Sequence, residues 1–169
     1  IKKHPEYRYF IKGIWFKLIG VSFFIIIYLF YYKGGDTITY FRGASALGEL
    51  ILSDSEKGLA ILFNTDSYYN SYSSFNYQTG FPAHSYFSNK NTFIVCRISA
   101  IFYLLSSKSF VVTSLLTSVF SYIGIWKFYR LLNLLYPKRQ KAFAYLILYM
   151  PSLIFWGGGI MKDSFMLGA

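Results

Sequence analysis

Three long apolar runs, almost free of charged residues, divide the chain at residues 14–32, 109–126 and 142–161. A helix needs about 20 residues to cross the hydrocarbon core of a bilayer, and each run is close to that length. The apolar residues are continuous in each run and do not alternate with polar ones, which favours helices over barrel strands. The pattern therefore predicts three membrane-spanning helices.

Particular residues modify the first and third runs. Lys17 interrupts the first run, and we expect its ammonium group to extend to the lipid headgroups while its stem stays in the apolar region. Pro151 should kink the third run, and the glycines at 157–159 should break it near its outer end. A shorter apolar stretch, 92–107, carries Arg97 at its centre, so it is either a tilted span or a helix at the interface.

The basic residues orient the chain, because cytoplasmic segments next to spans are enriched in Lys and Arg. One group precedes the first run and another separates the second from the third: Lys2, Lys3, Arg8, Lys12 and Lys17, then Lys127, Arg130, Lys138, Arg139 and Lys141. Both groups are predicted to be cytoplasmic, with the N-terminus inside and residues 33–108 outside. A complete crossing by 92–107 would place the second group outside, so we favour no crossing.

The predicted external loop contains two amphipathic segments. Apolar residues recur every three or four positions over 37–52, and a second short helix is expected over 55–63, capped by Asp54 or Ser55. Both are expected to lie along the membrane surface. The predicted fold is all-α: a polytopic transmembrane helical bundle with amphipathic interfacial helices in a long first external loop. Residues 1–169 are expected to form one membrane domain, incomplete at its C-terminus.

Composition supports this interpretation. Apolar residues make up 54% of the chain and charged residues 14%, against about a quarter charged in ordinary soluble domains. The formal net charge is +10, but the basic residues flank apolar runs, so they indicate anchoring to membrane lipids and no nucleic-acid partner. One cysteine, Cys96, excludes an internal disulfide. A soluble enzyme and a disulfide-stapled secreted module are excluded.

The candidate chemistry begins where the first run ends. Gly34 and Gly35 let the backbone turn at once and deliver Asp36 to the membrane surface. Asp36 is a candidate general base, or simply the N-cap of the following helix. Lys162 or Arg97 could hold a lipid-linked phosphate.

Each of these candidate cations has a simpler alternative. Lys162 and Asp163 could pair, or mark the first turn of another helix, and Arg97 could extend to the interface. Arg42 and Asp163 complete the candidate substrate-binding set.

A cytoplasmic N-terminus, one span, an immediate external Asp and amphipathic surface helices together resemble the GT-C class of integral-membrane glycosyltransferases. The resemblance rests on residues 34–40 and the N-terminal half. It implies transfer of a sugar from a polyprenyl-phosphate carrier on the external face, with Asp36 as the catalytic acid. Many members have a second acid nearby, whereas the next acid here is Glu49. No cofactor is assigned, and a divalent metal is retained only as an alternative; His4 and His84 lie on opposite predicted sides and share no metal site.

Two other functions remain open. An envelope polysaccharide polymerase would also join lipid-linked sugars outside the membrane and would depend on Arg97. A non-catalytic membrane subunit of a transport, secretion or motility complex would pack its small residues against a protein partner. Those residues are Gly20, Ser22, Ser114, Ser118, Ser121 and Gly124. For all three functions, the composition and loop chemistry suggest a bacterial inner membrane.

Overall fold

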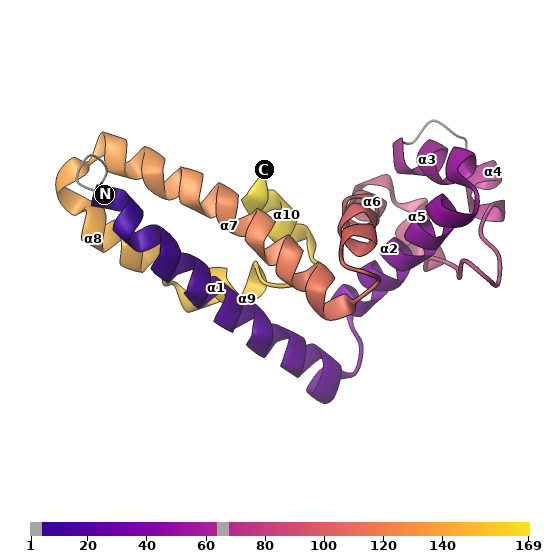
Figure 1. Ribbon diagram of the computed structural model, residues 1–169, viewed down its shortest axis with the longest axis horizontal. Coiled ribbons are helices and arrows are strands. Elements are labelled where there is room, and N and C mark those ends of the chain that lie inside the picture. Colours follow the sequence, from indigo (N-terminus) through magenta and orange to yellow (C-terminus); the bar gives the residue numbers. More distant parts are fainter. Residues whose placement is uncertain (1–4, 64–67) are drawn as a thin grey trace. The chain divides into compact units, whose positions relative to one another are not determined.

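The computed structural model describes residues 5–63 and 68–169, and every regular element in these ranges is a helix (Figure 1). The chain divides into two compact units. The first joins residues 1–32 with 114–169, and the second is the continuous stretch 33–113. The second unit therefore contains the whole of the predicted external loop. Three residues used in the sequence analysis lie outside the described ranges: Lys2, Lys3 and His4.

Two helices in the described residues are long and apolar enough to cross a membrane. One combines α1 (Arg8–Ile26) with its π-helical continuation η2 (Ile27–Tyr32), 25 residues in all, and the other is α7 (Phe110–Leu135), with 26 residues. Both predicted runs are therefore helical. The second helix continues beyond its predicted end at residue 126, because apolar side chains persist through Leu135 and no helix breaker occurs before Pro137.

The third apolar run does not form one continuous helix. It is divided among α8 (Gln140–Phe143), the π-helical η4 (Ala144–Leu148), α9 (Pro151–Trp156) and α10 (Lys162–Gly168). Pro151 opens α9 and its preceding residue, Met150, is extended, as expected before a proline. Gly157 to Gly159 lie between α9 and α10. The breaks occur at the residues that predicted them, and a bundle of three spans stays a prediction.

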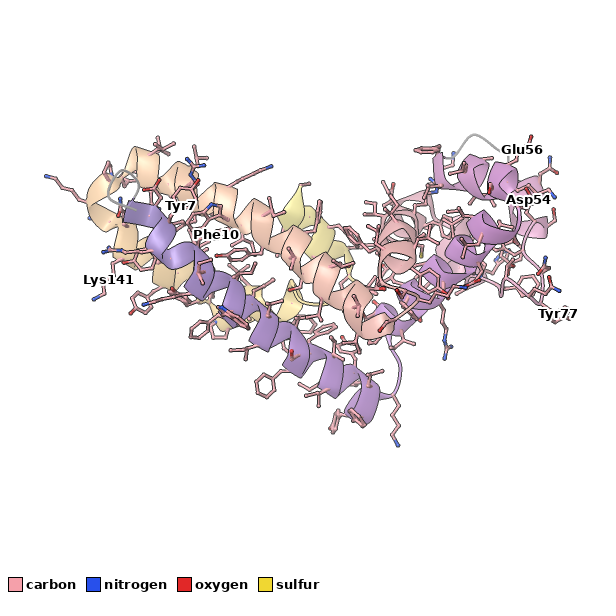
Figure 2. All side chains as sticks on the ribbon, viewed as in Figure 1. Tyr7, Phe10, Asp54, Glu56, Tyr77 and Lys141 are labelled. Carbon is pink, nitrogen blue, oxygen red and sulfur yellow. The ribbon has the colours of Figure 1, made fainter. Side chains whose placement is uncertain are left out.

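Aromatic side chains form the core of the first unit. Phe10 of α1 packs against Tyr122 and Trp126 of α7, with ring centroids 5.6 and 5.0 Å apart. The Tyr122 hydroxyl donates a hydrogen bond to the Phe10 carbonyl oxygen at 2.7 Å. Figure 2 shows Tyr7 and Phe10 on the side of α1 that faces α7. Buried phenols need a hydrogen-bond partner, and the backbone of α1 supplies this one.

The structure corrects the prediction for Lys17. Its side chain does not extend to an interface: the residue is 2% exposed, and its ammonium group donates to the Leu153 carbonyl oxygen at 2.9 Å. The same oxygen also accepts a long hydrogen bond, at 3.3 Å, from the amide of Gly157, which follows the last residue of α9. Gly157 leaves room for the ammonium group, since a Cβ there would meet the Lys17 Nζ.

Small residues of the first unit contact other helices of the same unit. A Cβ on Gly124 would meet the Leu167 backbone of α10, and one on Gly20 would meet the Ile154 side chain of α9. Ser114, Ser118 and Ser121 are fully buried. Gly20 and Gly124, two of the small residues that the sequence offered to a protein partner, are therefore packed within this unit.

The second unit is built on a pair of helices, α2 (Asp36–Ser53) and α6 (Lys90–Leu105). A Cβ on Gly43 of α2 would lie 2.7 Å from the Cys96 sulfur of α6, so the two helices approach closely there. Three shorter helices complete the unit: α3 (Ser55–Phe63), α4 (Tyr68–Ser73) and α5 (His84–Ser88). The two helices predicted over 37–52 and 55–63 are confirmed.

Candidate functional site

Asp36 is the first residue of α2, and the residue before it makes this geometry possible. Gly35 is the N-cap, with φ 96° and ψ −175°, a backbone conformation that favours glycine. Its carbonyl oxygen accepts hydrogen bonds from the Thr39 amide and hydroxyl groups, both at 3.1 Å. The alternative in which Asp36 itself caps the helix is therefore wrong, and its carboxylate is available for another contact.

Tyr86 of α5 makes that contact. Its phenol donates a hydrogen bond to Asp36 Oδ1 at 2.8 Å, and its ring packs edge-on to Tyr40 at 5.0 Å. Burial, reinforced by the hydrogen bond to Asp36, raises the pKa of the Tyr86 phenol to about 12. The phenol therefore keeps its proton at neutral pH and acts as a donor throughout.

The second carboxylate oxygen of Asp36 has no hydrogen-bond partner in the described part of the chain. Asp36 is exposed, so Oδ2 can accept a proton from a ligand while Tyr86 fixes Oδ1. An oriented carboxylate with one oxygen open is the geometry that a general base requires. The sequence did not single out Tyr86, because it lies 50 residues from Asp36 in a short polar segment without a motif.

Arg42 and Arg97 flank one of the close approaches of α2 to α6. Each is adjacent in sequence to one member of the Gly43–Cys96 contact. Arg42 is exposed, whereas Arg97 is half-buried with its guanidinium group 5.3 Å from the centre of the Phe93 ring. Burial lowers the pKa of Arg97. Arg42 lies six residues after Asp36, about 120° around the helix, so these two side chains leave α2 on different faces.

Lys162 and Asp163 are the first two residues of α10, and both are exposed. They belong to the first unit, whereas Asp36, Arg42 and Arg97 belong to the second. A carboxylate in the first turn interacts favourably with the helix dipole, which accounts for Asp163 locally. Among the candidate residues, Arg42 and Arg97 lie on turns of α2 and α6 that contact each other. The structure also identifies Tyr86 as the hydrogen-bond partner of Asp36.

A second polar cluster surrounds Glu49. Its Oε1 accepts a hydrogen bond from the Tyr103 phenol at 2.6 Å, and its Oε2 accepts one from the Lys108 ammonium group at 2.9 Å. Hydrogen bonding to Lys108 first, and then to Tyr103, lowers the pKa of the Glu49 carboxyl. Both oxygens are occupied, so Glu49 connects α2 to the end of α6 and does not supply the second acid found in many GT-C enzymes.

The described residues contain no group of three or more His, Cys, Asp or Glu side chains placed to hold a metal ion. Cys96 is buried, and burial raises the pKa of its thiol to about 12. A thiol of this kind is unreactive at neutral pH, because the thiolate is the nucleophilic form.

Comparison of the chain with protein-family models, with curated proteins and with solved structures found no match in any of the three.

Proposed function

We propose that the chain is an integral-membrane glycosyltransferase that moves a sugar from a polyprenyl-phosphate carrier to an acceptor hydroxyl on the external face of the membrane. One observation carries the proposal: Asp36 follows a 25-residue apolar helix almost directly and presents a carboxylate with Oδ1 held by Tyr86 and Oδ2 open. An oriented base this close in sequence to an apolar helix supports a reaction at the membrane surface, where lipid-linked substrates meet water.

In the proposed reaction, Asp36 Oδ2 takes the proton of the acceptor hydroxyl. The hydroxyl oxygen then forms a bond to the anomeric carbon of the sugar, and the bond from that carbon to the phosphate oxygen breaks. The electron pair leaves with the phosphate, so the second product is polyprenyl phosphate. Arg97 or Lys162 neutralises the leaving phosphate, with Arg42 and Asp163 as further substrate contacts.

The proposal includes a bacterial inner-membrane location with a cytoplasmic N-terminus. It is supported by the exposed apolar side chains of α1, among them Trp15 at 62% and Phe23 at 60%. Water penalises such a surface, whereas lipid chains do not. The distribution of Lys and Arg supports the orientation, with α2, α3 and α6 on the external side.

The direct test is a transfer assay with the full chain in proteoliposomes, a polyprenyl-phosphate sugar and an acceptor glycan pool. Asp36→Asn keeps the Tyr86 contact but removes the base, and we expect activity to fall about 100-fold or more. Asp54→Asn is the matched control, since Asp54 is another carboxylate of the same unit at a helix start. Tyr86→Phe should cost less than Asp36→Asn, because it affects orientation only.

Disulfide trapping tests whether the base and a candidate cation share one cavity. Asp36→Cys is combined with Lys162→Cys in a Cys96→Ser background, and with Lys141→Cys as the negative control, which is predicted to lie on the other side. Efficient bond formation in the first pair alone supports a common site. If both pairs stay reduced while positions 36 and 162 react with a water-soluble thiol reagent, Lys162 has no place in the site.

The transfer assay also separates the alternative functions. Loss of activity in Arg97→Ala together with a tolerant Asp36→Asn indicates a polysaccharide polymerase, an option favoured by the half-buried Arg97 beside the α2–α6 contact. A chain without transfer activity that co-purifies with a membrane complex indicates a non-catalytic subunit. Against the subunit, two of its predicted contact residues, Gly20 and Gly124, pack within the first unit.

A further inference from the structure

An open hollow lies on the turn that follows α7, in η3 (Pro137–Arg139), α8 and η4. Its volume is about 570 Å³, and its lining residues are Lys138, Arg139, Lys141, Ala142 and Tyr145. A neighbouring hollow of about 370 Å³ shares two of these cations and adds three other residues, Leu135, Tyr136 and Pro137. Three basic side chains thus line one open hollow, and Figure 2 shows Lys141 beside the ribbon of α8.

No acidic side chain among the described residues pairs with these three cations. In the part of the chain that the structure describes, the side chains of Lys138, Arg139 and Lys141 have no hydrogen bond or ion pair. Residues 127–145 contain five basic residues and no acidic one. Like charges held this close repel each other, so binding of an anion between them is favourable.

Apolar side chains continue directly from the cations. Leu135 is 62% exposed, Tyr136 56%, Tyr145 59% and Leu146 63%. A small soluble anion would use only the basic groups and would leave this apolar surface in water. A lipid satisfies both parts, because its charged headgroup meets the cations and its acyl chains cover the apolar residues.

We propose that the hollow lined by Lys138, Arg139 and Lys141 binds the phosphate headgroup of an anionic phospholipid, with the acyl chains along Leu135 and Tyr136. The site shares no residue with the proposed transfer site, so either can fail without the other. A basic residue near an anionic membrane surface strengthens binding roughly fivefold. Removing three should therefore weaken retention of the lipid by at least about tenfold.

The test uses the full chain, released from detergent and measured by native mass spectrometry in the presence of phosphatidylglycerol or of phosphatidylcholine with the same acyl chains. The hollow variant is Lys138→Gln/Arg139→Gln/Lys141→Gln. Its control, Arg8→Gln/Lys12→Gln/Lys127→Gln, removes the same charge from exposed residues of α1 and α7. We expect the native chain and the control to retain phosphatidylglycerol selectively. The hollow variant should retain about tenfold less of this lipid.

Equal loss in both variants would overturn the proposal, because attraction would then depend on net charge alone. Equal retention of the two lipids would also overturn it, since the headgroup charge would not be recognised. Displacement of phosphatidylglycerol by glycerol phosphate at comparable concentration would assign the hollow to a soluble phosphate compound instead. The charge-conserving Lys138→Arg/Lys141→Arg variant must retain the lipid, which separates loss of the site from loss of folding.

Discussion

Aromatic rings pack in both units of this chain, for example Phe10 against Trp126 in the first and Phe87 against Phe93 in the second, but charged residues are distributed differently. The second unit contains five of the seven acidic residues, Asp36, Glu49, Asp54, Glu56 and Asp66, and its described residues include the ion pairs Glu49–Lys108 and Asp54–Lys57. The first unit relies on aromatic contacts between α1 and α7. Its buried hydroxyls at Ser114, Ser118 and Ser121 have no hydrogen-bond partner among the described residues.

The difference is the one that our proposal requires, with the first unit in lipid and the second in water. Ion pairs at a surface are useful where water surrounds them, although each is weak. A helix surface covered with exposed Trp, Phe and Ile, as on α1, is favourable where lipid surrounds it. In the first unit, small residues let the helix backbones approach closely, and we expect these contacts to determine which helices pack together.

The largest expected effect tests that close contact. Gly124→Ala places a methyl group against the Leu167 backbone of α10, and overpacking against backbone should destabilise the first unit by about 2–3 kcal/mol. Thermal unfolding of the purified chain and hydrogen exchange of the α10 amides measure this. Ser118→Ala, which removes a buried hydroxyl without a partner, should leave stability unchanged or slightly higher. Equal tolerance of both changes would mean that α7 and α10 do not pack as described.

In the second unit, the Glu49 cluster should make stability depend on pH. Its pKa is lowered from 4.5 in the folded chain, so its stabilisation is complete above pH 4.5 and is lost as the pH falls through the folded value. Hydrogen exchange of the last turn of α6, corrected for intrinsic rates, should therefore quicken below pH 4.5. Glu49→Gln should remove this dependence and cost about 1 kcal/mol. Asp54→Asn, at a separate ion pair, should keep it.

Removing the charge of Lys17 should stabilise the protein, whereas removing the charge of Glu49 from its ion pair should destabilise it. Its ammonium group is buried and donates to one carbonyl oxygen, and replacing a buried charge by an apolar group of similar volume is often neutral or stabilising. Lys17→Met should therefore raise the free energy of unfolding by up to about 1 kcal/mol. A lower thermal midpoint for Lys17→Met would contradict this account. A stabilised variant that has lost transfer activity would assign Lys17 a functional role.

The prediction with the smallest expected effect on the protein concerns the depth of α6 in the membrane. Ile94 and Leu105 are exposed on one face of this helix, about 16 Å apart along its axis. Nitroxide labels at these two positions, in a Cys96→Ser background, should report similar depths if α6 lies along the membrane surface. A label at Glu56 serves as the water-exposed reference. Depths that differ by more than about 10 Å would show that α6 crosses the membrane and would reverse the predicted orientation of residues 138–141.

Local patterns predicted much of the architecture but little of the site. Periodic apolar residues indicated the helices over 37–52 and 55–63, and the structure contains them as α2 and α3. Asp36 was found because glycines precede it at the end of an apolar run. Tyr86 carried no comparable signal, and the Arg42–Arg97 neighbourhood depends on how α2 packs on α6.

The helical character, the two long apolar helices and the breaks at Pro151 and the glycines 157–159 could be predicted from the sequence, because each depends on residues within a few turns. Which polar groups meet depends on how the helices pack in three dimensions. Tyr86 reaches Asp36 across 50 residues, and Lys17 reaches Leu153 across 136. Such pairs form where packing brings helices together and a buried or oriented polar group requires a partner, and no spacing along the chain encodes that choice.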